Sequence, residues 1–255
     1  MATSSSRCTA TPKSRELDPV PDSSFTPRRL RVESVARRTD SVWLFTFVAA
    51  EGDRIDDVKF EPGQVAVLSV PDVGEAYMAI ASAPDARHRL EFLVKNEGPF
   101  GTRLFDLGHE ADVSLVRLAG HGFPVDQYWG RDLLFVAAGT AIAPIRAAVS
   151  HAASRRSSFG RLVLVHGVRR PEDFAVDDEI DAWRHADVDV VLTVTQPGDD
   201  GWRGSTGRVQ KLLEAAVRTS TNPVAFVCGS AAMMDETTSV LVELGIDRDQ
   251  IIRNY

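Results

Sequence analysis

Cysteine is nearly absent from this sequence, because only Cys8 and Cys228 occur among its 255 residues. Two thiols exclude a disulfide framework, and they exclude a four-cysteine zinc or iron–sulfur site within one chain. Paired histidines are missing too, since none of the six histidines stands in a His-x-x-x-His or Glu-x-x-His pattern. We therefore expect no metal site, and we expect the reducing environment of the cytoplasm.

Positive charge and long apolar runs are also scarce. The formal net charge of -7 argues against a nucleic-acid partner or an anionic membrane surface, either of which needs a basic face. No apolar run approaches the roughly 20 residues of a membrane-spanning helix. Residues 1–26 are rich in Ser, Thr and Pro and lack the apolar core of a secretory signal. We expect them to form a disordered tail, with a plastid transit peptide as the alternative.

The hydrophobic residues, 44% of the chain, follow two different patterns. In residues 27–127 short apolar runs alternate with turn residues, and these runs are 30–35, 42–48, 65–70, 90–94 and 113–118. In the second run Trp43, Phe45 and Phe47 would share one face of a strand. Short strands at near-regular spacing predict a small antiparallel β-barrel for this first domain.

Residues 128–255 alternate between strand-like and helix-like segments. The expected strands are 133–137, 162–165, 188–195, 224–228 and 251–252, and the expected helices are 142–151, 177–184, 209–217 and 231–244. This alternation predicts parallel βαβ units with helices on both faces of one sheet. The join between the two domains is expected at 127–130.

Two strand ends in the second domain carry candidate ligand-binding residues. The first is Ala138-Gly139-Thr140-Ala141-Ile142-Ala143-Pro144, where Gly139 permits a tight turn and Pro144 suits the first turn of a helix. Backbone N–H groups and the helix dipole favour a pyrophosphate at such a turn, although an ordinary strand–helix turn has the same pattern. The second is Val227-Cys228-Gly229-Ser230, at the carboxyl end of another strand. The alternative for Cys228 is a small buried apolar residue.

Together these segments resemble the nicotinamide domain of the ferredoxin–NADP reductase superfamily, which has Gly-Gly-Thr-Gly-Ile-Ala-Pro at the first strand end and Cys-Gly-Pro-x-x-Met at the fourth. The segments 166–173 and 202–209 are similar to the family's Tyr-Gly-x-Arg-x-x-x-Asp and Gly-x-x-Gly-x-Val. In the first domain, Phe-Glu-Pro-Gly-Gln at 60–64 resembles the turn before the flavin strand. Gly-Pro-Phe-Gly-Thr-Arg-Leu at 98–104 resembles the loop and helix start that hold the flavin pyrophosphate.

The sequence departs from this family at the flavin signature Arg-x-Tyr-Ser, where it has Ala76-Tyr77-Met78-Ala79. The departure removes the arginine that pairs with flavin phosphate, the tyrosine that packs on the flavin and the serine near flavin N5. We expect Tyr77 to stack on a flavin and backbone groups of Ile80, Ala81 and Ser82 to bind it. The nearby Gly74-Glu75-Ala76 resembles the branch that feeds multisubunit hydrogenases and dihydroorotate dehydrogenases, without that branch's C-terminal four-cysteine tail for a [2Fe–2S] cluster.

The resemblance implies a flavin-dependent oxidoreductase that moves a hydride between NAD(P)H and bound FAD, with FMN as the alternative, and then passes electrons to a partner protein or to a small acceptor. It assigns flavin phosphate to Gly98, Gly101 and Thr102, and the nicotinamide dinucleotide to Gly139, Thr140 and Pro144. Further assignments are a 2′-phosphate at Arg169 and Arg170, the nicotinamide ring near Cys228 and Gly229, and a terminal aromatic over the flavin at Tyr255. The competing hypotheses are a flavin-poor nucleotide-binding or regulatory subunit without turnover, and an electron-transfer subunit that docks on an iron–sulfur partner.

Overall fold

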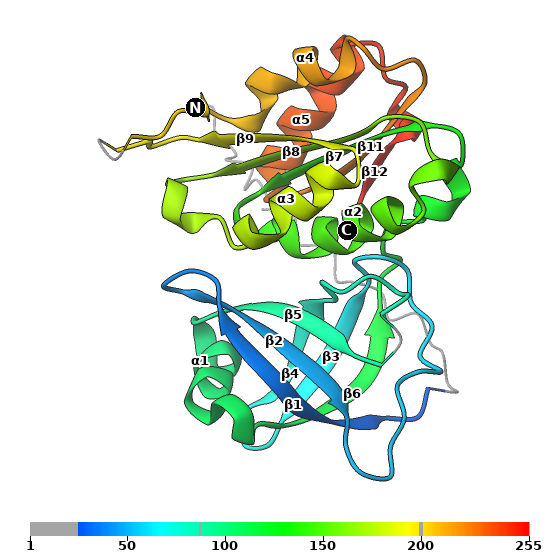
Figure 1. Cartoon of the computed structure of the whole chain (residues 1–255). Coiled ribbons are helices and arrows are strands. Elements are labelled where there is room, and N and C mark those ends of the chain that lie inside the picture. Colours follow the sequence, from blue (N-terminus) through cyan, green and yellow to red (C-terminus); the bar gives the residue numbers. More distant parts are fainter. Residues whose placement is uncertain (1–24, 87, 199–200, 255) are drawn as a thin grey trace, which may run out of the picture.

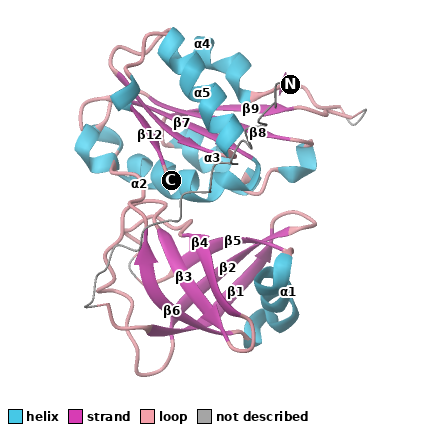
Figure 2. Ribbon diagram, turned by 180° about the vertical axis from the view of Figure 1, so that it is seen from behind, coloured by secondary structure: helices cyan, strands magenta, loops and turns pink. Residues whose placement is uncertain are grey.

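The computed structural model describes residues 25–86, 88–198 and 201–254. This part of the chain forms two lobes that lie against each other (Figure 1). The first lobe is an antiparallel six-stranded sheet with one helix, and the second is a parallel six-stranded sheet with helices on both faces (Figure 2). The predicted fold class, an antiparallel barrel followed by a parallel α/β sheet, is confirmed. Residues 1–24 of the predicted tail, and Tyr255, lie outside the described residues.

The first lobe is built from elements close to the predicted runs. They are β1 (Arg28–Arg37), β2 (Val42–Ala49), β3 (Val65–Val70), β4 (Gly74–Ala79), β5 (Leu90–Lys95), α1 (Gly98–Leu107), the 3₁₀ turn η1 (Gly108–Glu110) and β6 (Asp112–Ala119). The strand order is β4-β3-β6-β1-β2-β5, so β4 and β5 form the two edges of the sheet. Trp43, Phe45 and Phe47 all pack in the core of this lobe, as their alternation predicts.

Strand β4 is the one strand of the first lobe, among the described residues, that the apolar runs did not predict. Its sequence Gly-Glu-Ala-Tyr-Met-Ala is only weakly apolar, and it becomes a strand by pairing with β3 from Val65 opposite Ala79 to Val70 opposite Gly74. The short connection between the two strands requires left-handed backbone at Asp72 and Gly74, whose φ angles are 68° and 98°. Pairing with a neighbour therefore decides this strand more than its own side chains do.

The second lobe follows the predicted alternation of strands and helices. Its elements are η2 (Val125–Tyr128), β7 (Asp132–Ala138), η3 (Gly139–Ala141), α2 (Ile142–Ser154), η4 (Arg156–Ser158), β8 (Leu162–Val168), η5 (Pro171–Asp173), α3 (Asp177–His185), β9 (Val188–Val194), β10 (Ser205–Thr206), η6 (Val209–Leu212), α4 (Leu213–Val217), β11 (Pro223–Cys228), α5 (Ala231–Glu243), η7 (Arg248–Gln250) and β12 (Ile251–Arg253). The predicted helix 209–217 begins as the 3₁₀ turn η6 before it becomes α4, which is a common way for a helix to start.

The parallel sheet has the order β10-β9-β8-β7-β11-β12. The chain runs outward from β7 to β10 and then crosses to β11 on the other side of β7, so the direction of winding changes between β7 and β11. Helices α2 and α3 cover the sheet face toward the first lobe, and α4 and α5 cover the opposite face (Figure 1). Open α/β sheets bind ligands at the carboxyl ends of strands beside such a switch point.

Apolar packing joins the two lobes into one body. Val42 and Leu44 of β2 belong to the same buried cluster as Phe135 of β7 and Ile145 of α2. Both faces of β2 are therefore buried, one in the first lobe and the other under the second, which accounts for its unbroken apolar and β-branched sequence.

Candidate functional site

Two pockets lie on the side of the second lobe where its parallel strands end. The cleft pocket, about 370 Å³, lies between the lobes and is lined by residues of both sheet edges β4 and β5, the first turn of α1 and the first turn of α2. The sheet-edge pocket, about 450 Å³, is lined by residues that follow β7, β8, β9 and β11. An edge strand has one side without a neighbouring strand, so β4 and β5 can present backbone groups to a ligand.

The first turn of α1 forms one end of the cleft pocket. This turn has neither an acidic side chain nor a side-chain cap, so its backbone N–H groups are open to an anion. Only glycine fits at position 101, because a Cβ there would lie 2.2 Å from the carbonyl oxygen of Lys95. Gly98, at the helix start, has a left-handed φ of 67°. Thr102 is exposed, one residue beyond the pocket lining.

The turn after β7 borders both pockets. Gly139 lines the sheet-edge pocket, whereas Thr140, Ala141, Ala143 and Pro144 line the cleft pocket. The φ angle of Gly139 is 59°, and a Cβ there would point into open space. Like α1, helix α2 starts without an acidic side chain or a side-chain cap. This one turn therefore connects the two pockets through exposed backbone donors.

Pro144 has a second function, as a contact between the lobes. Gly63, in the Pro-Gly-Gln turn of the first lobe, packs so tightly on it that a Cβ at Gly63 would lie 2.6 Å from the Pro144 Cβ and 2.8 Å from its Cα. The carbonyl of Gly63 also accepts a hydrogen bond of 3.1 Å from Nδ2 of Asn254 in the second lobe. The absence of a side chain at residue 63 thus sets how closely the lobes approach.

The segment that aligns with the flavin signature forms a cleft wall of small and flexible side chains. Ala76, Met78 and Ala79 line the cleft pocket together with Tyr77, a residue that is 52% exposed. Arg117 of β6 donates a 3.0 Å hydrogen bond to the Tyr77 hydroxyl, which holds the ring at the surface. Tyr77 therefore lies beside the cleft pocket, and its stacking on a flavin stays a prediction.

The structure does not support the direct flavin contact expected of Ile80, Ala81 and Ser82. All three are buried, and they lie behind the cleft wall rather than on it. The Ile80 N–H donates to the carbonyl of Gln64 at 2.9 Å, and the Ala81 N–H donates to the carbonyl of Glu91 at 2.7 Å. The Ser82 hydroxyl accepts a 3.1 Å hydrogen bond from the Glu91 N–H. These groups hold the end of β4 in place from within the protein.

The sheet-edge pocket separates the two predicted arginines. Arg169 lines the pocket and donates from Nε to Oε1 of Gln196 at 2.9 Å. Arg170 is exposed and lies outside the lining, with Nη1 at 3.8 Å from Glu172 Oε1. Sequence reasoning missed Arg208, which also lines this pocket. The only signal for Arg208 was its place in the segment 202–209, which resembles a family motif.

The strand end at β11 differs from its predicted arrangement. The Cys228 side chain is fully buried in the core cluster beneath α2 and lines neither pocket. Its burial favours the alternative of a small apolar core residue over a contact with nicotinamide. Gly229 is partly exposed, and a Cβ there would lie 2.4 Å from Sδ of Met233. Ser230 lines the sheet-edge pocket and caps α5 by accepting from the Met233 N–H.

His166 at the end of β8 was not predicted to have a role, and it supports the turn after β7. The ring is fully buried, and its Nε2 lies 3.2 Å from the carbonyl oxygen of Gly139, so this nitrogen carries the proton. Burial lowers the pKa of His166 to about 4, and the hydrogen bond to Gly139 opposes that change only in part. The ring packs edge-on against Phe174 with centroids 5.3 Å apart. His166 is therefore a neutral brace for the Gly139 turn.

Neither a metal-binding cluster nor a membrane-spanning helix occurs in the described part of the chain. Among residues 25–86, 88–198 and 201–254, no three His, Cys, Asp or Glu side chains gather closely enough to hold a metal ion. None of the helices formed by those residues has the length and hydropathy needed to span a bilayer.

Comparison with known proteins gives the same picture. Residues 135–239 match the family model of the oxidoreductase NAD-binding domain. The gamma subunit of sulfhydrogenase 1 from Pyrococcus furiosus is 29% identical over 235 residues, which cover 90% of this chain and 80% of that protein. The probable electron transfer subunit of dihydroorotate dehydrogenase B (NAD(+)) from the same organism is 28% identical over 198 residues, covering 76% of this chain and 70% of that protein.

A solved structure shares the arrangement of both lobes. The ferredoxin NADP+ reductase from Neisseria gonorrhoeae, with bound FAD and NADP, superposes with a TM-score of 0.72 at 23% identity, covering 89% of this chain and 97% of that one. At this identity the match establishes the fold alone. Residues 135–239 thus match an oxidoreductase NAD-binding domain, and most of the chain is similar in sequence or fold to FAD/NAD-binding oxidoreductases of the ferredoxin–NADP reductase type.

Proposed function

We propose that this chain is a reductase that holds a nicotinamide dinucleotide against a flavin and passes the electrons on to a partner protein. The observation that supports this most directly is the turn 138–144, which lines both pockets. A dinucleotide in the sheet-edge pocket would follow this turn into the cleft pocket and place its nicotinamide ring there. A flavin in the cleft pocket would then lie beside that ring.

The residues present fit a nicotinamide dinucleotide. The open space beside Gly139 lets a pyrophosphate approach the backbone, and the exposed turn at Gly139 and Thr140, just before α2, would supply N–H donors for it. Arg169 and Arg208 provide positive charge farther along the same pocket. Nη1 of Arg208 lies 3.3 Å from Oε2 of Glu236, so Arg208 would have to leave this ion pair in order to bind a phosphate.

The cleft pocket has backbone donors for FAD, or for FMN as the alternative, but it has little positive charge to bind the flavin phosphate. The first turn of α1 offers backbone donors, and Lys95 adds a cation to the cleft lining, 2.6 Å from Glu97. The arginine of the family signature is replaced by Ala76. A hydrogen bond to a charged group contributes about 1.5–3 kcal/mol, so we propose that the flavin is held more loosely than in relatives with the full signature.

In this proposal the chain supplies binding, orientation and shielding from water. Bound flavin and nicotinamide would carry the hydride chemistry themselves. Met78, Ala79 and Leu93 form an apolar wall of the cleft, which would keep water away from the reacting atoms. The two helix starts would hold the phosphates and thereby set the distance between the rings, and such positioning can contribute a large part of a rate enhancement.

The acceptor is proposed by class only. The relatives include a hydrogenase gamma subunit and an electron transfer subunit, so we propose that the electrons leave for a redox partner protein rather than for a small substrate. The second candidate is a flavin-poor nucleotide-binding or regulatory subunit. The substitutions Ala76, Met78 and Ala79 in the flavin signature favour that reading.

An absorption experiment separates the two candidates. The purified protein is incubated with FAD and, separately, with FMN, passed over a desalting column, and titrated anaerobically with NADH and NADPH. The proposed function predicts retained visible flavin absorbance that bleaches on addition of one or both nicotinamides, together with steady reduction of ferricyanide. A protein that binds nicotinamide dinucleotide but retains no flavin and reduces no ferricyanide would establish the second candidate instead.

A further inference from the structure

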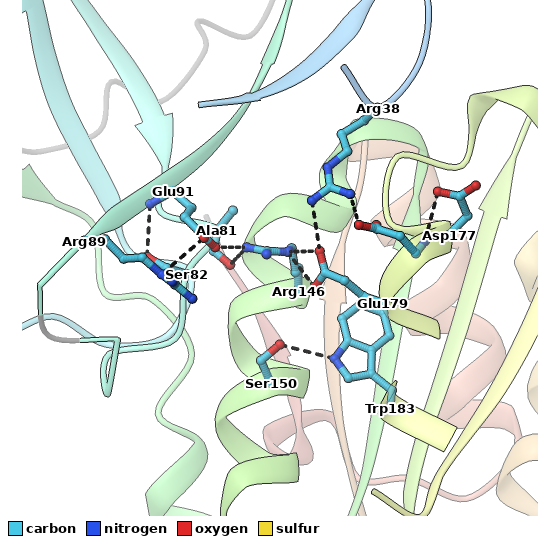
Figure 3. A network of polar contacts seen from close by, with 11 residues as sticks. Arg38, Ala81, Ser82, Arg89, Glu91, Arg146, Ser150, Asp177, Glu179 and Trp183 are labelled. Carbon is cyan, nitrogen blue, oxygen red and sulfur yellow. Dashed lines mark hydrogen bonds and ion pairs between the residues drawn. The ribbon is translucent and has the colours of Figure 1, made fainter. Parts of the chain in front are cut away.

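A buried network of charged groups crosses the boundary between the lobes (Figure 3). At its centre is Arg146, which extends from α2 of the second lobe. Its carboxylate partners come from opposite sides: Glu91 belongs to β5 of the first lobe, and Glu179 belongs to α3 of the second. One cation is thus shared between carboxylates of two lobes.

The contacts of Arg146 are short and directional. Nη1 donates to Oε2 of Glu91 at 2.7 Å and to the carbonyl oxygen of Ala81 at 2.9 Å. Nε lies 2.7 Å and 2.8 Å from the two carboxylate oxygens of Glu179. Arg89 Nε lies 3.3 Å from the other oxygen of Glu91, and Arg38 Nη2 lies 3.9 Å from Oε1 of Glu179 while its Nη1 pairs with Asp178. Arginines therefore flank both carboxylates from outside the centre of the network.

The centre of the network is well shielded from water. The side chains of Arg146 and Glu91 are each 10% exposed, and that of Glu179 is 20% exposed. Burial tends to lower the pKa of Arg146, but the two carboxylates raise it overall, so the guanidinium stays charged. A buried charge that loses its partner is strongly destabilising, whereas a pair exposed at the surface contributes little.

The network lies directly behind the cleft pocket and contacts segments from both of its sides. Arg146 follows Pro144 by two residues on α2, and Ala81 follows Ala79 by two residues after β4. Pro144 and Ala79 line opposite walls of the cleft pocket. The hydrogen bond from Arg146 to the Ala81 carbonyl therefore ties the nicotinamide side of the cleft to its flavin side, a short distance behind the pocket.

We propose that Arg146 is a positioning residue that sets the separation of the two cleft walls, and through it the distance between nicotinamide and flavin. This inference rests on the proposed function. The guanidinium suits the task because its planar fork directs hydrogen bonds to several partners at once, which the single ammonium of lysine does not. Hydride transfer is sensitive to this distance, since a displacement of about 1 Å can slow a reaction about 100-fold.

The kinetic test compares R146M, R146K and a matched control, R156M. Arg156 also bonds a carboxylate, Asp187 at 2.7 Å, but it does so within the second lobe, at the opposite end of the parallel strands. We expect R146M to lower the limiting rate of flavin reduction by about 100-fold while the Kd of the nicotinamide changes little. The rate of R146K should lie between those of R146M and the wild type, and the rate of R156M should equal that of the wild type. An R146M rate equal to that of R156M overturns the inference.

A second measurement does not depend on activity. In R146M the backbone amides of Ala81 and Glu91 should exchange hydrogen faster than in the wild type and in R156M, and the radius of gyration in X-ray scattering should rise. Unchanged exchange and scattering overturn the inference. If the wild-type protein binds or reduces no flavin, the proposed function fails on its own, and these two measurements still decide whether Arg146 holds the lobes together.

A triple variant separates positioning from simple stability. R146M/E91Q/E179Q removes the cation together with the two carboxylates that would otherwise stay charged with only their outer partners, Arg89 and Arg38, so its stability should recover toward that of the wild type. If Arg146 positions the cleft walls, flavin reduction should remain slow in this variant despite the recovered stability. A reduction rate that returns with the stability shows a merely structural arginine and overturns the inference.

Discussion

Replacing Gly63 by alanine should loosen the contact between the lobes. The substitution carries two separate costs. Gly63 has a left-handed φ of 71°, which costs a residue with a Cβ about 1–2 kcal/mol. The new Cβ would also meet Pro144 at 2.6 Å, and it would meet backbone atoms there as well as the ring, so a shift of the lobes is needed. Overpacking of this kind costs typically about 1–3 kcal/mol.

A second glycine provides the matched control for this prediction. Gly52 also has a left-handed φ, 83°, but a Cβ there would meet nothing within 4 Å. G52A should therefore show the backbone cost alone, and the difference between G63A and G52A should be the lobe contact, about 1–3 kcal/mol. The free energy of unfolding is measured by urea denaturation of both variants and the wild type, and the flavin reduction rate is measured alongside.

The outcome that would refute the reasoning is equality of the two variants. If G63A and G52A lose the same stability and reduce flavin at the same rate, the close approach of Gly63 to Pro144 does not govern the cleft. If G63A alone slows flavin reduction, the lobe separation controls the reaction, as the position of Pro144 in the cleft lining indicates.

Further predictions concern pH and nucleotide choice. The pKa of His166 falls from its ordinary 6.5 to about 4 on burial, so between these pH values the unfolded chain binds a proton that the folded chain does not, and stability should decrease as pH falls from about 6.5 to 4. The loss attributable to this group is about 3 kcal/mol at most, and it should be seen as a pH-dependent difference in unfolding free energy between the wild type and H166F. A difference that stays constant across this pH range would show that the imidazole is not the source of the loss. R169A should weaken binding of NADPH by about 1.5–3 kcal/mol with a smaller effect on NADH, whereas R170A, outside the pocket, should affect neither; equal effects of the two variants in binding titrations would contradict this assignment.

Local patterns in the sequence were sufficient for most of the fold. The unbroken apolar run of β7, the glycine after it and the helical pattern of α2 depend on neighbours close in sequence, so the strand–turn–helix unit could be predicted. The same holds for β2, whose alternation places Phe45 and Phe47 in one core. Strand β4 could not be predicted in this way, because its pairing with β3 makes it a strand and its own composition does not.

Several features of the site were decided by tertiary structure alone. Cys228 ends a strand just before the turn that starts α5, yet the fold directs its side chain into the core beneath α2. Ile80, Ala81 and Ser82 follow the flavin-signature positions, yet their burial and internal hydrogen bonds place them behind the cleft wall. A strand end indicates where the backbone arrives, but the packing of other elements determines which side chains remain open.

The sequence by itself determined the two lobes, the order of their elements and the two glycine-rich turns at which phosphates would bind, because each of these depends on short-range periodicity or on backbone freedom at one residue. Only the tertiary structure brought Arg146 to Glu91 and Glu179, which lie 55 and 33 positions away from it. No local pattern records such a pairing. It arises because the apolar cluster shared by both lobes buries these charges at one boundary, where a charge is stable only beside its partner.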